Sequence, residues 1–593
     1  MKKALPIGIE NFRDMVWKDC YYIDKTAFIK PLMEAGNKVL LLTRPRRFGK
    51  TLFMDTLKSF LQLDFQKGIN GERNALLFKG LRIAQDRDFC SRHMGRYPVI
   101  SMTLKDVEGG DFESAYVQFA ENLEDTLDPY RFLMDSPKLS PRDKDTLRQY
   151  LTTGYLKDSA HVADCKNFLK NLAAWLSKHY DRQVVILIDE YDVPLAKAAQ
   201  FGYYDKMLEL VRAFLGQALK EKPQAQSDAP AYLMKAVLTG CLRVSKESIF
   251  TGINNPLINT VCSEDRSLSE IIGFTADEVR SFLDYYGLSN RYDDVKRWYD
   301  GYRFYESEIY CPWDVINFAY YARESGDDGY EPENYWDKTS DSSVIREFLG
   351  FLNEDDAERM QRLVDGESVE LEINDKLTYS DFKEHDPTDF WTLLLYSGYL
   401  TAISRVKGVL NTYRVRIPNE EIRDTFEKNV RSLYSKKNKQ YAGYGEKLAV
   451  ALLSGQADGV RRVLLPLLRR YVSVRDEATK APPENYYHGF LSAMLICAGS
   501  TAANLRSSPE AGLGIADLVF TSEDLETGIV IEVKRCHKPE EMPKAAREAI
   551  KQIKEKRYVQ VFDGYECRRC FGYGIAFCKK LCVVSVEELT PEQ

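Results

Sequence analysis

The sequence predicts an α/β protein whose two ends carry sheets and whose middle is mainly helical. Before residue 290, apolar runs typical of buried strands alternate with long helical patterns; the runs lie at 39–43, 97–102, 184–189 and 232–240. Between about 276 and 475 the strand pattern fades and helical periodicity dominates. The remaining residues return to helices and strands. We therefore expect three regions, at 1–275, 276–475 and 476–593.

Composition places the chain among ordinary globular proteins. Of its 593 residues, 44% are apolar and 29% are charged. The formal net charge of −7 excludes a uniformly basic coat for nucleic acid and is too small for a polyacidic tail. A local basic groove stays compatible with these numbers.

The sequence predicts neither secretion nor membrane insertion. Pro6, Gly8, Glu10 and Arg13 occupy the place where a signal peptide needs an apolar segment. The stretch without formal charge from Tyr486 to Leu505 is interrupted by glycine, serine, threonine and asparagine, as in a buried helix and its following turn. We expect a cytoplasmic protein with no membrane partner.

Twelve cysteines are far too few for a disulfide scaffold of this length. Four of them cluster near the C-terminus and have a spacing that can suit zinc: Cys567, Cys570, Cys578 and Cys582. The surrounding residues alternate like a strand, which would turn successive side chains to opposite faces. Buried free thiols are therefore favoured over a metal site.

A phosphate-binding loop is predicted between the first apolar strand and the first long helix. It comprises Arg44, Pro45, Arg46, Arg47, Phe48, Gly49, Lys50 and Thr51. Backbone N–H groups at a helix N-terminus bind phosphate, Lys50 would reach the β- and γ-phosphates of ATP, and Thr51 would ligate Mg²⁺. Arg44 stands where the P-loop pattern has glycine. The alternative is a basic strand-to-helix turn.

A second nucleotide motif is the strand VVILIDEYD at 184–192, which ends in adjacent carboxylates. Asp189 would hold Mg²⁺ through water, and Glu190 would polarise the attacking water. The two motifs together predict ATP binding and favour hydrolysis. Their long separation predicts a helical insertion between about 105 and 180.

The apolar run VLTGCLRV at 237–244 fits a further strand of this domain. Thr239 at its end would sense the γ-phosphate, and Arg243 would contact phosphate or the adjoining loop. Ordinary strand-end roles are the alternative for both residues.

The C-terminal region carries a candidate nuclease site on two apolar strands, 510–520 and 528–535, joined by a polar turn. Asp517 begins the first strand's apolar part, and Glu532 and Lys534 lie two residues apart, on one face of the second. Two carboxylates can hold Mg²⁺ or Mn²⁺, and a lysine can orient water and stabilise developing charge. A solvated ion pair is the alternative.

The helical pattern that follows this site is modestly basic. Residues 538–558 contain seven Lys or Arg and four Glu. Such a face suits a phosphate backbone. An ordinary solvated helix face explains it equally well.

These motifs resemble two known families. The segments LPIGIENF, RPRRFGKT, LIDEYDVPL and TGCLRVSKESIFTGINN resemble the AAA-ATPase-like family of bacterial proteins, and ENYYHGFL, EAGLGIADLVF, IVIEVK and AIKQIKEKRY resemble the PD-(D/E)XK nuclease superfamily. The middle segments GYRFY, IYCPWDVINF and LLLYSGYLT belong to the same resemblance. It implies an AAA-like P-loop domain and a restriction-endonuclease-like domain.

The resemblance also assigns roles to residues. It implies that Arg44 is tolerated in the loop and that Asp517, Glu532 and Lys534 form the PD-(D/E)XK triad. Glu510 and Gln552 match the family's Glu-x-Gly-x-Gly and helical Gln positions, whereas Ile515 replaces a residue that is basic in many relatives. Glu484 is a candidate helix-borne acid for the metal site, although a cap or solvent role suits its linker position better.

The leading hypothesis is an ATP-regulated, metal-dependent nuclease that acts on DNA or RNA. The alternative is a nucleotide-dependent switch or scaffold whose nuclease fold binds nucleic acid without cutting it. A serine hydrolase is disfavoured because no G-x-S-x-G motif is present. A defence or mobile-element role is suggested by the architecture alone. Oligomerisation stays open.

Overall fold

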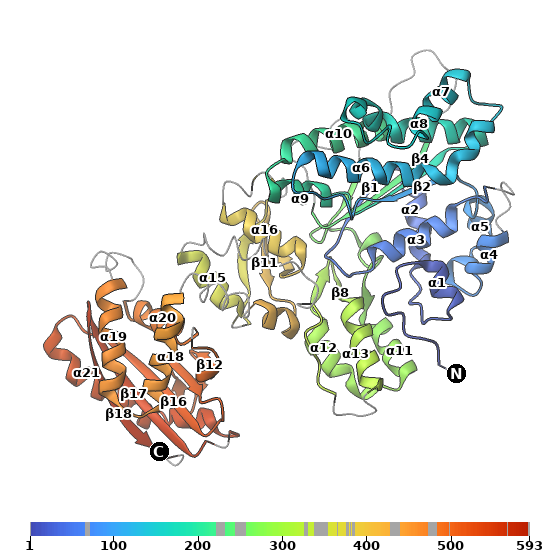
Figure 1. Cartoon of the computed structure of the whole chain (residues 1–593). Helices are drawn as coiled ribbons and strands as arrows, with labels where there is room; N and C mark the ends of the chain where they lie inside the picture. The colour runs from blue at the N-terminus through green and yellow to red at the C-terminus, as the bar shows by residue number, and fades with distance from the viewer. Residues whose placement is uncertain are drawn as a thin grey trace. The chain divides into compact units, whose positions relative to one another are not determined.

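Figure 1 shows the computed structural model of the chain. The structure describes residues 2–65, 72–220, 232–242, 256–324, 330–336, 354–364, 366–374, 377, 379, 381, 386–426, 439–471, 483–496, 498–565 and 567–590. The chain divides into two compact units, Met1–Glu427 and Lys428–Gln593. The expected three regions do not coincide with these units, and as domain boundaries they stay a prediction.

The first unit is built on a parallel five-stranded sheet with the order β2-β3-β4-β1-β5. Its strands are β1 (Val39–Thr43), β2 (Val99–Thr103), β3 (Val184–Asp189), β4 (Leu233–Gly240) and β5 (Leu257–Asn259). The first four are the strands that the sequence predicts. Because β4 lies between β1 and β3, the carboxyl ends of these three strands meet at one edge, where ligands bind in sheets of this kind.

Ten helices in the described part of residues 2–220 surround this sheet. They are α1 (Phe12–Trp17), α2 (Ile29–Glu34), α3 (Lys50–Leu61), α4 (Glu72–Leu77), α5 (Arg87–His93), α6 (Phe112–Leu127), α7 (Pro141–Tyr150), α8 (Val162–Tyr180), α9 (Val193–Phe201) and α10 (Tyr204–Leu219). Figure 1 shows α6, α8 and α10 on one face of the sheet and α3 on the other. The helices α6 to α8 form the helical insertion expected between the two nucleotide motifs.

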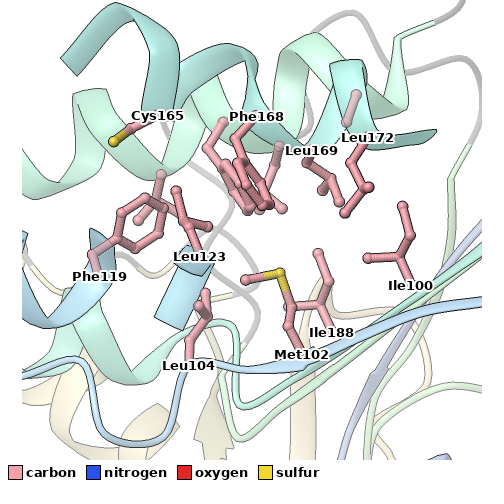
Figure 2. Close-up of a cluster of buried hydrophobic side chains, with 14 of the residues drawn as sticks. Ile100, Met102, Leu104, Phe119, Leu123, Cys165, Phe168, Leu169, Leu172 and Ile188 are labelled. Atoms are coloured by element: carbon pink, nitrogen blue, oxygen red, sulfur yellow. The ribbon is translucent and has the colours of Figure 1, made fainter. Parts of the chain in front are cut away.

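Apolar side chains of α6 and α8 fix this layer on the sheet. Figure 2 shows Phe119 and Leu123 of α6 and Phe168 and Leu172 of α8 above Ile188 of β3. All five side chains are fully buried. This packed layer of α6 and α8 therefore holds the end of β3 in place.

The region after β5 is largely helical, as expected, but it also holds two small antiparallel sheets. Its described helices are α11 (Ala276–Tyr286), α12 (Tyr292–Tyr299), α13 (Pro312–Glu324), α15 (Glu354–Val364) and α16 (Pro387–Ser397). The sheets are β6-β8-β7 and β10-β11-β9, formed by β6 (Phe274–Thr275), β7 (Tyr302–Phe304), β8 (Ser307–Tyr310), β9 (Val369–Glu372), β10 (Thr401–Arg405) and β11 (Thr412–Arg416). Strands of two to five residues are too short to show the alternation that would predict them.

The second unit has a five-stranded sheet with the order β12-β15-β16-β17-β18. Its strands are β12 (Ala503–Ser507), β15 (Leu518–Thr521), β16 (Thr527–Arg535), β17 (Arg569–Cys578) and β18 (Leu581–Leu589). The strands β15 and β16 pair antiparallel, as the polar turn between them predicts. The helix α21 (Met542–Glu555) connects β16 to its parallel neighbour β17. A short hairpin of β13 (Glu510–Ala511) and β14 (Gly514–Ile515) precedes β15.

Helices cover both faces of this second sheet. One face, which includes Ile529, Ile531 and Val533, packs with α18 (Lys439–Leu453), α19 (Ala457–Tyr471) and α20 (Pro483–Ile496). The opposite face, which includes Val530, packs on α21. The helices α18 and α19 fall in the middle region by sequence, yet their apolar faces complete the core of this unit.

The four C-terminal cysteines do not gather at one place. Cys567 and Cys570 belong to the core around Ile553, Cys578 packs with Cys536 and Met542, and Cys582 faces the α18–α20 side. No group of three or more metal-ligating side chains occurs among the described residues. Cys570, Cys578 and Cys582 are buried, Cys567 is half-buried, and all four are free thiols. Within the same described ranges, no helix has the length and apolar character that crossing a bilayer requires.

Candidate functional sites

The turn between β1 and α3 has the backbone of a phosphate-binding loop. Gly49 adopts φ 90° and Arg47 φ 67°, both in the left-handed region. Glycine takes this conformation without steric cost. The helix α3 then begins at Lys50, and the Phe53 amide donates to the Gly49 carbonyl. The free N–H groups of this first turn lie at the sheet edge where β1, β3 and β4 end.

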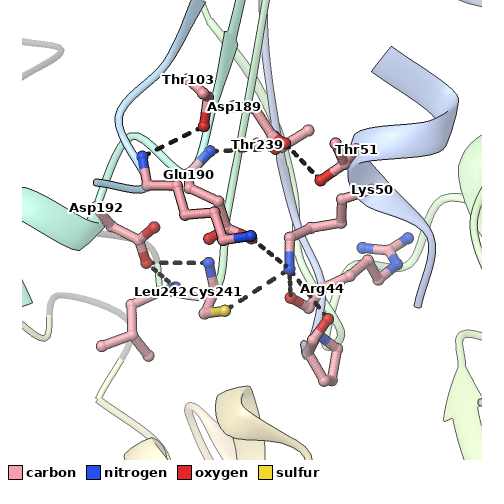
Figure 3. Close-up of polar contacts among 12 residues, drawn as sticks. Arg44, Lys50, Thr51, Thr103, Asp189, Glu190, Asp192, Thr239, Cys241 and Leu242 are labelled. Atoms are coloured by element: carbon pink, nitrogen blue, oxygen red, sulfur yellow. Dashed lines mark hydrogen bonds and ion pairs between the residues drawn. The ribbon is translucent and has the colours of Figure 1, made fainter. Parts of the chain in front are cut away.

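Lys50 is buried at the centre of this site (Figure 3). Its Nζ donates to the carbonyl oxygens of Arg44 at 3.2 Å and Pro45 at 3.1 Å, and it lies 3.4 Å from Oε1 of Glu190. Burial opposes the charge, but Cys241, Glu190 and Asp189 raise the pKa of Lys50 above its ordinary value. The ammonium therefore stays charged, and it is held by groups that phosphate oxygens can replace.

Asp189 connects three elements of the site. Its Oδ2 accepts a 2.6 Å hydrogen bond from the Thr51 hydroxyl, and its Oδ1 accepts from the Thr239 hydroxyl at the end of β4. The Glu190 amide donates to the same Oδ1 at 3.1 Å. A hydroxyl beside a carboxylate is an oxygen set that suits Mg²⁺. The predicted partners Thr51, Asp189 and Thr239 therefore meet in one place.

Glu190 and Asp192 leave β3 in different directions. Glu190 has φ 52°, and its partly exposed carboxylate faces Lys50. Asp192 is buried, and its Oδ2 accepts hydrogen bonds from the amides of Cys241 and Leu242 at 2.9 and 2.8 Å. Burial and then the charge of Glu190 raise the pKa of Asp192 to about 6. Of the two acids, only Glu190 is placed to act on a ligand.

The side chain of Arg44 serves packing. Its buried guanidinium donates to the Thr43 carbonyl, to Oδ1 of Asn259 at 2.7 Å and to the Leu268 carbonyl, and it lies over the Phe304 ring at 4.7 Å. Burial lowers the pKa of Arg44 to about 9. This network explains how an arginine can replace glycine here: the side chain points away from the loop, towards Asn259 and Leu268. Phosphate contact by its backbone stays a prediction.

Two other loop residues, Phe48 and Arg47, also pack against the middle region. Phe48 is buried with its ring centroid 4.9 Å from that of Tyr302. The guanidinium of Arg47 donates to the Tyr335 carbonyl at 3.1 Å and lies 5.3 Å from the Trp336 ring centroid. Arg46 is exposed, whereas Pro45 is buried. The predicted residue Arg243 lies outside the described residues.

The second candidate site lies where β15 and β16 meet. The Val533 amide donates to Oδ2 of Asp517 at 2.7 Å, and Lys534 Nζ donates to Oε1 of Glu532 at 2.9 Å. Glu532 is on the α21 face of β16, since its neighbours Ile531 and Val533 pack on the opposite face. The structure thus places Glu532 and Lys534 together, as period-2 geometry predicts, and brings Asp517 of the preceding segment close to them.

Glu532 is electrostatically suited to a cation. Burial and then the charge of Asp517 raise the pKa of Glu532 to about 7, while Lys534 and the nearby Gln552 amide lower it. Its buried Oε2 accepts no hydrogen bond of good geometry from any described residue. A buried acceptor without a partner is costly, and a divalent cation shared with Asp517 would satisfy it. These residues therefore fit the metal that the chemistry implies.

The structure adds His488 of α20, which sequence reasoning missed. Its Nε2 lies 2.9 Å from the Asp517 carbonyl oxygen and 3.3 Å from the Ser507 hydroxyl. Position 488 is one helical turn after Glu484, the candidate acid, whose side chain lies outside the description. That spacing is the signal that could have found it.

Of two further predicted residues, Gln552 interacts with Glu532, whereas Glu510 forms no hydrogen bond or ion pair with the described residues Asp517, Glu532 and Lys534. Gln552 of α21 donates to the Tyr558 hydroxyl at 3.2 Å. Glu510 is exposed on β13, opposite Ile515.

Comparisons with known proteins match the two parts of the chain that hold these candidate sites. Residues 6–250 match the family described as predicted AAA-ATPase, and residues 482–587 match the PD-(D/E)XK nuclease superfamily. A protein described as "Uncharacterized protein in vnfD 5′ region", from Azotobacter chroococcum mcd 1, is 26% identical over 430 residues, 71% of this chain and 69% of that protein. No solved structure matches the chain. The chain therefore combines an N-terminal AAA-ATPase-like domain with a C-terminal domain of the PD-(D/E)XK nuclease superfamily.

Proposed function

We propose that this protein binds and hydrolyses ATP and that it cleaves phosphodiester bonds of nucleic acid in a metal-dependent reaction. The observation that supports cleavage most directly is the buried Glu532, which is bonded to Lys534 and close to Asp517. No described residue donates a hydrogen bond of good geometry to its Oε2. A structural ion pair would have no need of a second, repelling carboxylate.

At the ATP site, each residue has a distinct task. Lys50 would exchange the carbonyl oxygens of Arg44 and Pro45 for phosphate oxygens, which bind an ammonium more strongly. Thr51 and Asp189 would hold Mg²⁺ beside the phosphates. Glu190 would orient and polarise the attacking water. Thr239 would couple β4 to the nucleotide, because its hydroxyl donates to the Asp189 carboxylate.

At the nuclease site, Asp517 and Glu532 would hold Mg²⁺ or Mn²⁺, which supplies charge neutralisation and water activation when bound. Lys534 would help to orient the attacking water and would stabilise the charge that develops on the phosphate. The Val533 amide keeps the Asp517 carboxylate directed at this position. ATP binding would alter the middle region through the contacts of Arg47 and Phe48.

A cleavage assay on single- and double-stranded DNA and RNA tests the proposal, with Mg²⁺ or Mn²⁺ and with or without ATP. We expect cleavage by the wild type and its loss in Lys534→Ala, with Arg568→Ala as a matched control on an exposed cation. Binding without cleavage under every condition would favour a nucleotide-dependent switch or scaffold. We also propose a cytoplasmic location, from the sequence patterns described above, and a defence or mobile-element role, from the domain combination.

A further inference from the structure

The hairpin β13–β14 presents two aliphatic side chains to solvent beside the candidate nuclease site. Leu513 is 69% exposed and Ile515 is 59% exposed, whereas Ala511 and Ala516 are buried beneath them. Most large aliphatic side chains of the described second unit lie in its cores. Two exposed ones within the short hairpin 510–515 therefore need an explanation.

The hairpin is held rigidly, so this exposure is built into the fold. Gly512 has φ 52°, and a Cβ there would lie 2.3 Å from the carbonyl oxygens of Lys556 and Arg557. The Leu513 amide donates to the Lys556 carbonyl at 2.7 Å. A Cβ on Gly514 would lie 3.2 Å from the Tyr558 hydroxyl. The hairpin is thus fastened to the end of α21 and cannot turn its apolar tip inward.

The same contacts join the hairpin to the candidate catalytic residues. The Ser508 amide, just before β13, donates to the Asp517 carbonyl at 2.8 Å. The Tyr558 hydroxyl, which contacts the hairpin at Gly514, accepts from Gln552, and the Gln552 amide influences Glu532. These contacts link the hairpin to Asp517 and Glu532, so a nucleic acid held at those two residues would lie near the hairpin.

Two exposed cations follow α21 where the hairpin is fastened, and the hairpin itself carries one exposed anion, Glu510. Lys556 and Arg557 are exposed and form no ion pair within the described part of the second unit. Arg506 on β12 is also exposed, and its guanidinium reaches the Val561 carbonyl at 3.3 Å. Cations beside an apolar tip complement a nucleic-acid duplex, whose backbone is anionic and whose stacked bases form an apolar interior. Two aliphatic side chains are too few for a stable protein interface, which buries about 800 Å² per partner.

We propose that the β13–β14 hairpin inserts Leu513 and Ile515 between neighbouring base pairs of a duplex substrate, next to the bond that is cleaved. This rests on the proposed nuclease function and names the state of its substrate. Leucine and isoleucine act as wedges between base steps in proteins that kink duplexes, and the unstacking costs a few kcal/mol per step. Lys556 and Arg557 would offset that cost through phosphate contacts.

The test uses the full chain in EDTA, where duplex binding is measured without cleavage. Duplexes carry 2-aminopurine at successive positions, because its fluorescence rises when its stacking is lost. The variant is the double change Leu513→Asn, Ile515→Asn; the matched control is Leu581→Asn, at a 40% exposed leucine in the same unit. We expect the wild type and the control to raise the fluorescence at one step and the double variant to abolish the rise.

A second variant separates the wedge from the charge. Lys556→Gln, Arg557→Gln should weaken binding to all duplexes and reduce the salt dependence by about two phosphate contacts, with the fluorescence rise retained at saturation. An equal rise in the double asparagine variant would overturn the inference, as would binding to single strands alone. If the wild-type protein cleaves duplexes without unstacking them, the wedge is refuted and the proposed nuclease function stands. Wild type that unstacks without cleaving would support the wedge and refute the nuclease.

Discussion

The Thr51 hydroxyl donates a 2.6 Å hydrogen bond to Oδ2 of Asp189, which joins the first turn of α3 to the end of β3. These two residues are 138 positions apart in the chain. The contact places the proposed Mg²⁺-binding groups of two motifs side by side, next to the buried ammonium of Lys50. The behaviour of the nucleotide site can therefore be tested one residue at a time.

Lys50→Ala should abolish ATP binding and leave the fold intact. The change removes the buried charge that faces phosphate, and loss of one partner from such a pair costs roughly 2–5 kcal/mol of binding free energy. Titration calorimetry with ATP measures it, and Lys58→Ala on the same helix is the control. Unchanged ATP affinity in the Lys50 variant would reject the P-loop assignment.

Glu190→Gln should bind ATP normally but hydrolyse it roughly 10²- to 10⁴-fold more slowly, because the amide keeps the shape and loses the base. Asp192→Ala should instead lower stability, since it leaves the Cys241 and Leu242 amides without their acceptor. Phosphate release and thermal unfolding distinguish the two effects. Normal turnover in Glu190→Gln would show that its carboxylate is structural.

Arg44→Gly restores the P-loop pattern yet should destabilise the first unit by roughly 3 kcal/mol or more, because it deletes a buried guanidinium and orphans its acceptors. All six tryptophans lie before residue 428, so tryptophan fluorescence reports unfolding of this unit. The exposed Arg46→Ala should shift stability by no more than about 0.5 kcal/mol. Equal stability of the two variants would contradict the packing role of Arg44.

The buried carboxyl of Asp314 predicts a pH dependence. Burial raises the pKa of Asp314 from 3.8 to about 6, beside Glu421, whose pKa is also raised by burial and by Asp314. A folded-state pKa above the unfolded value contributes stability that is full below pH 4 and is lost as pH rises towards 6. Asp314→Asn should therefore stabilise the first unit by roughly 1–3 kcal/mol at pH 7 and by nothing at pH 4.

Tryptophan-detected unfolding across this pH range measures the effect. A constant stability difference between pH 4 and pH 7 would contradict the prediction.

Much of the nucleotide site could be predicted because its residues lie at the ends of apolar runs. The strands β1, β3 and β4 show their burial as continuous apolar sequence, and parallel strands align their carboxyl ends. Thr51, Asp189 and Thr239 follow from that rule. The role of the Arg44 side chain did not, since its acceptors at Asn259 and Leu268 are more than 200 residues away.

The nuclease site followed from period 2 on β16, which puts Glu532 and Lys534 on one face. His488 was missed because the only signal for it in the sequence is its place one helical turn after Glu484, and its contact is with a backbone carbonyl. The small sheets of the middle region were missed because their strands are too short to show an alternating pattern. The helices α18 and α19 were assigned to the middle because amphipathic periodicity shows that a face is buried without showing its partner.

The nuclease site should separate metal binding from chemistry. Asp517→Asn and Glu532→Gln each remove a charge that neutralises a divalent cation, so each should weaken Mn²⁺ binding in calorimetry. Lys534→Ala should bind Mn²⁺ as the wild type does and lose cleavage by roughly 10²-fold or more. All three variants should keep wild-type ATP affinity, because the two sites belong to different compact units.

The central claim is tested most directly by Mg²⁺-dependent cleavage of nucleic acid by the full chain, with wild type and the double variant Asp517→Asn, Glu532→Gln compared side by side. The account predicts cleavage by the wild type that EDTA abolishes, and no cleavage by the double variant. Robust Mg²⁺-dependent cleavage by the double variant would contradict the assignment of the site.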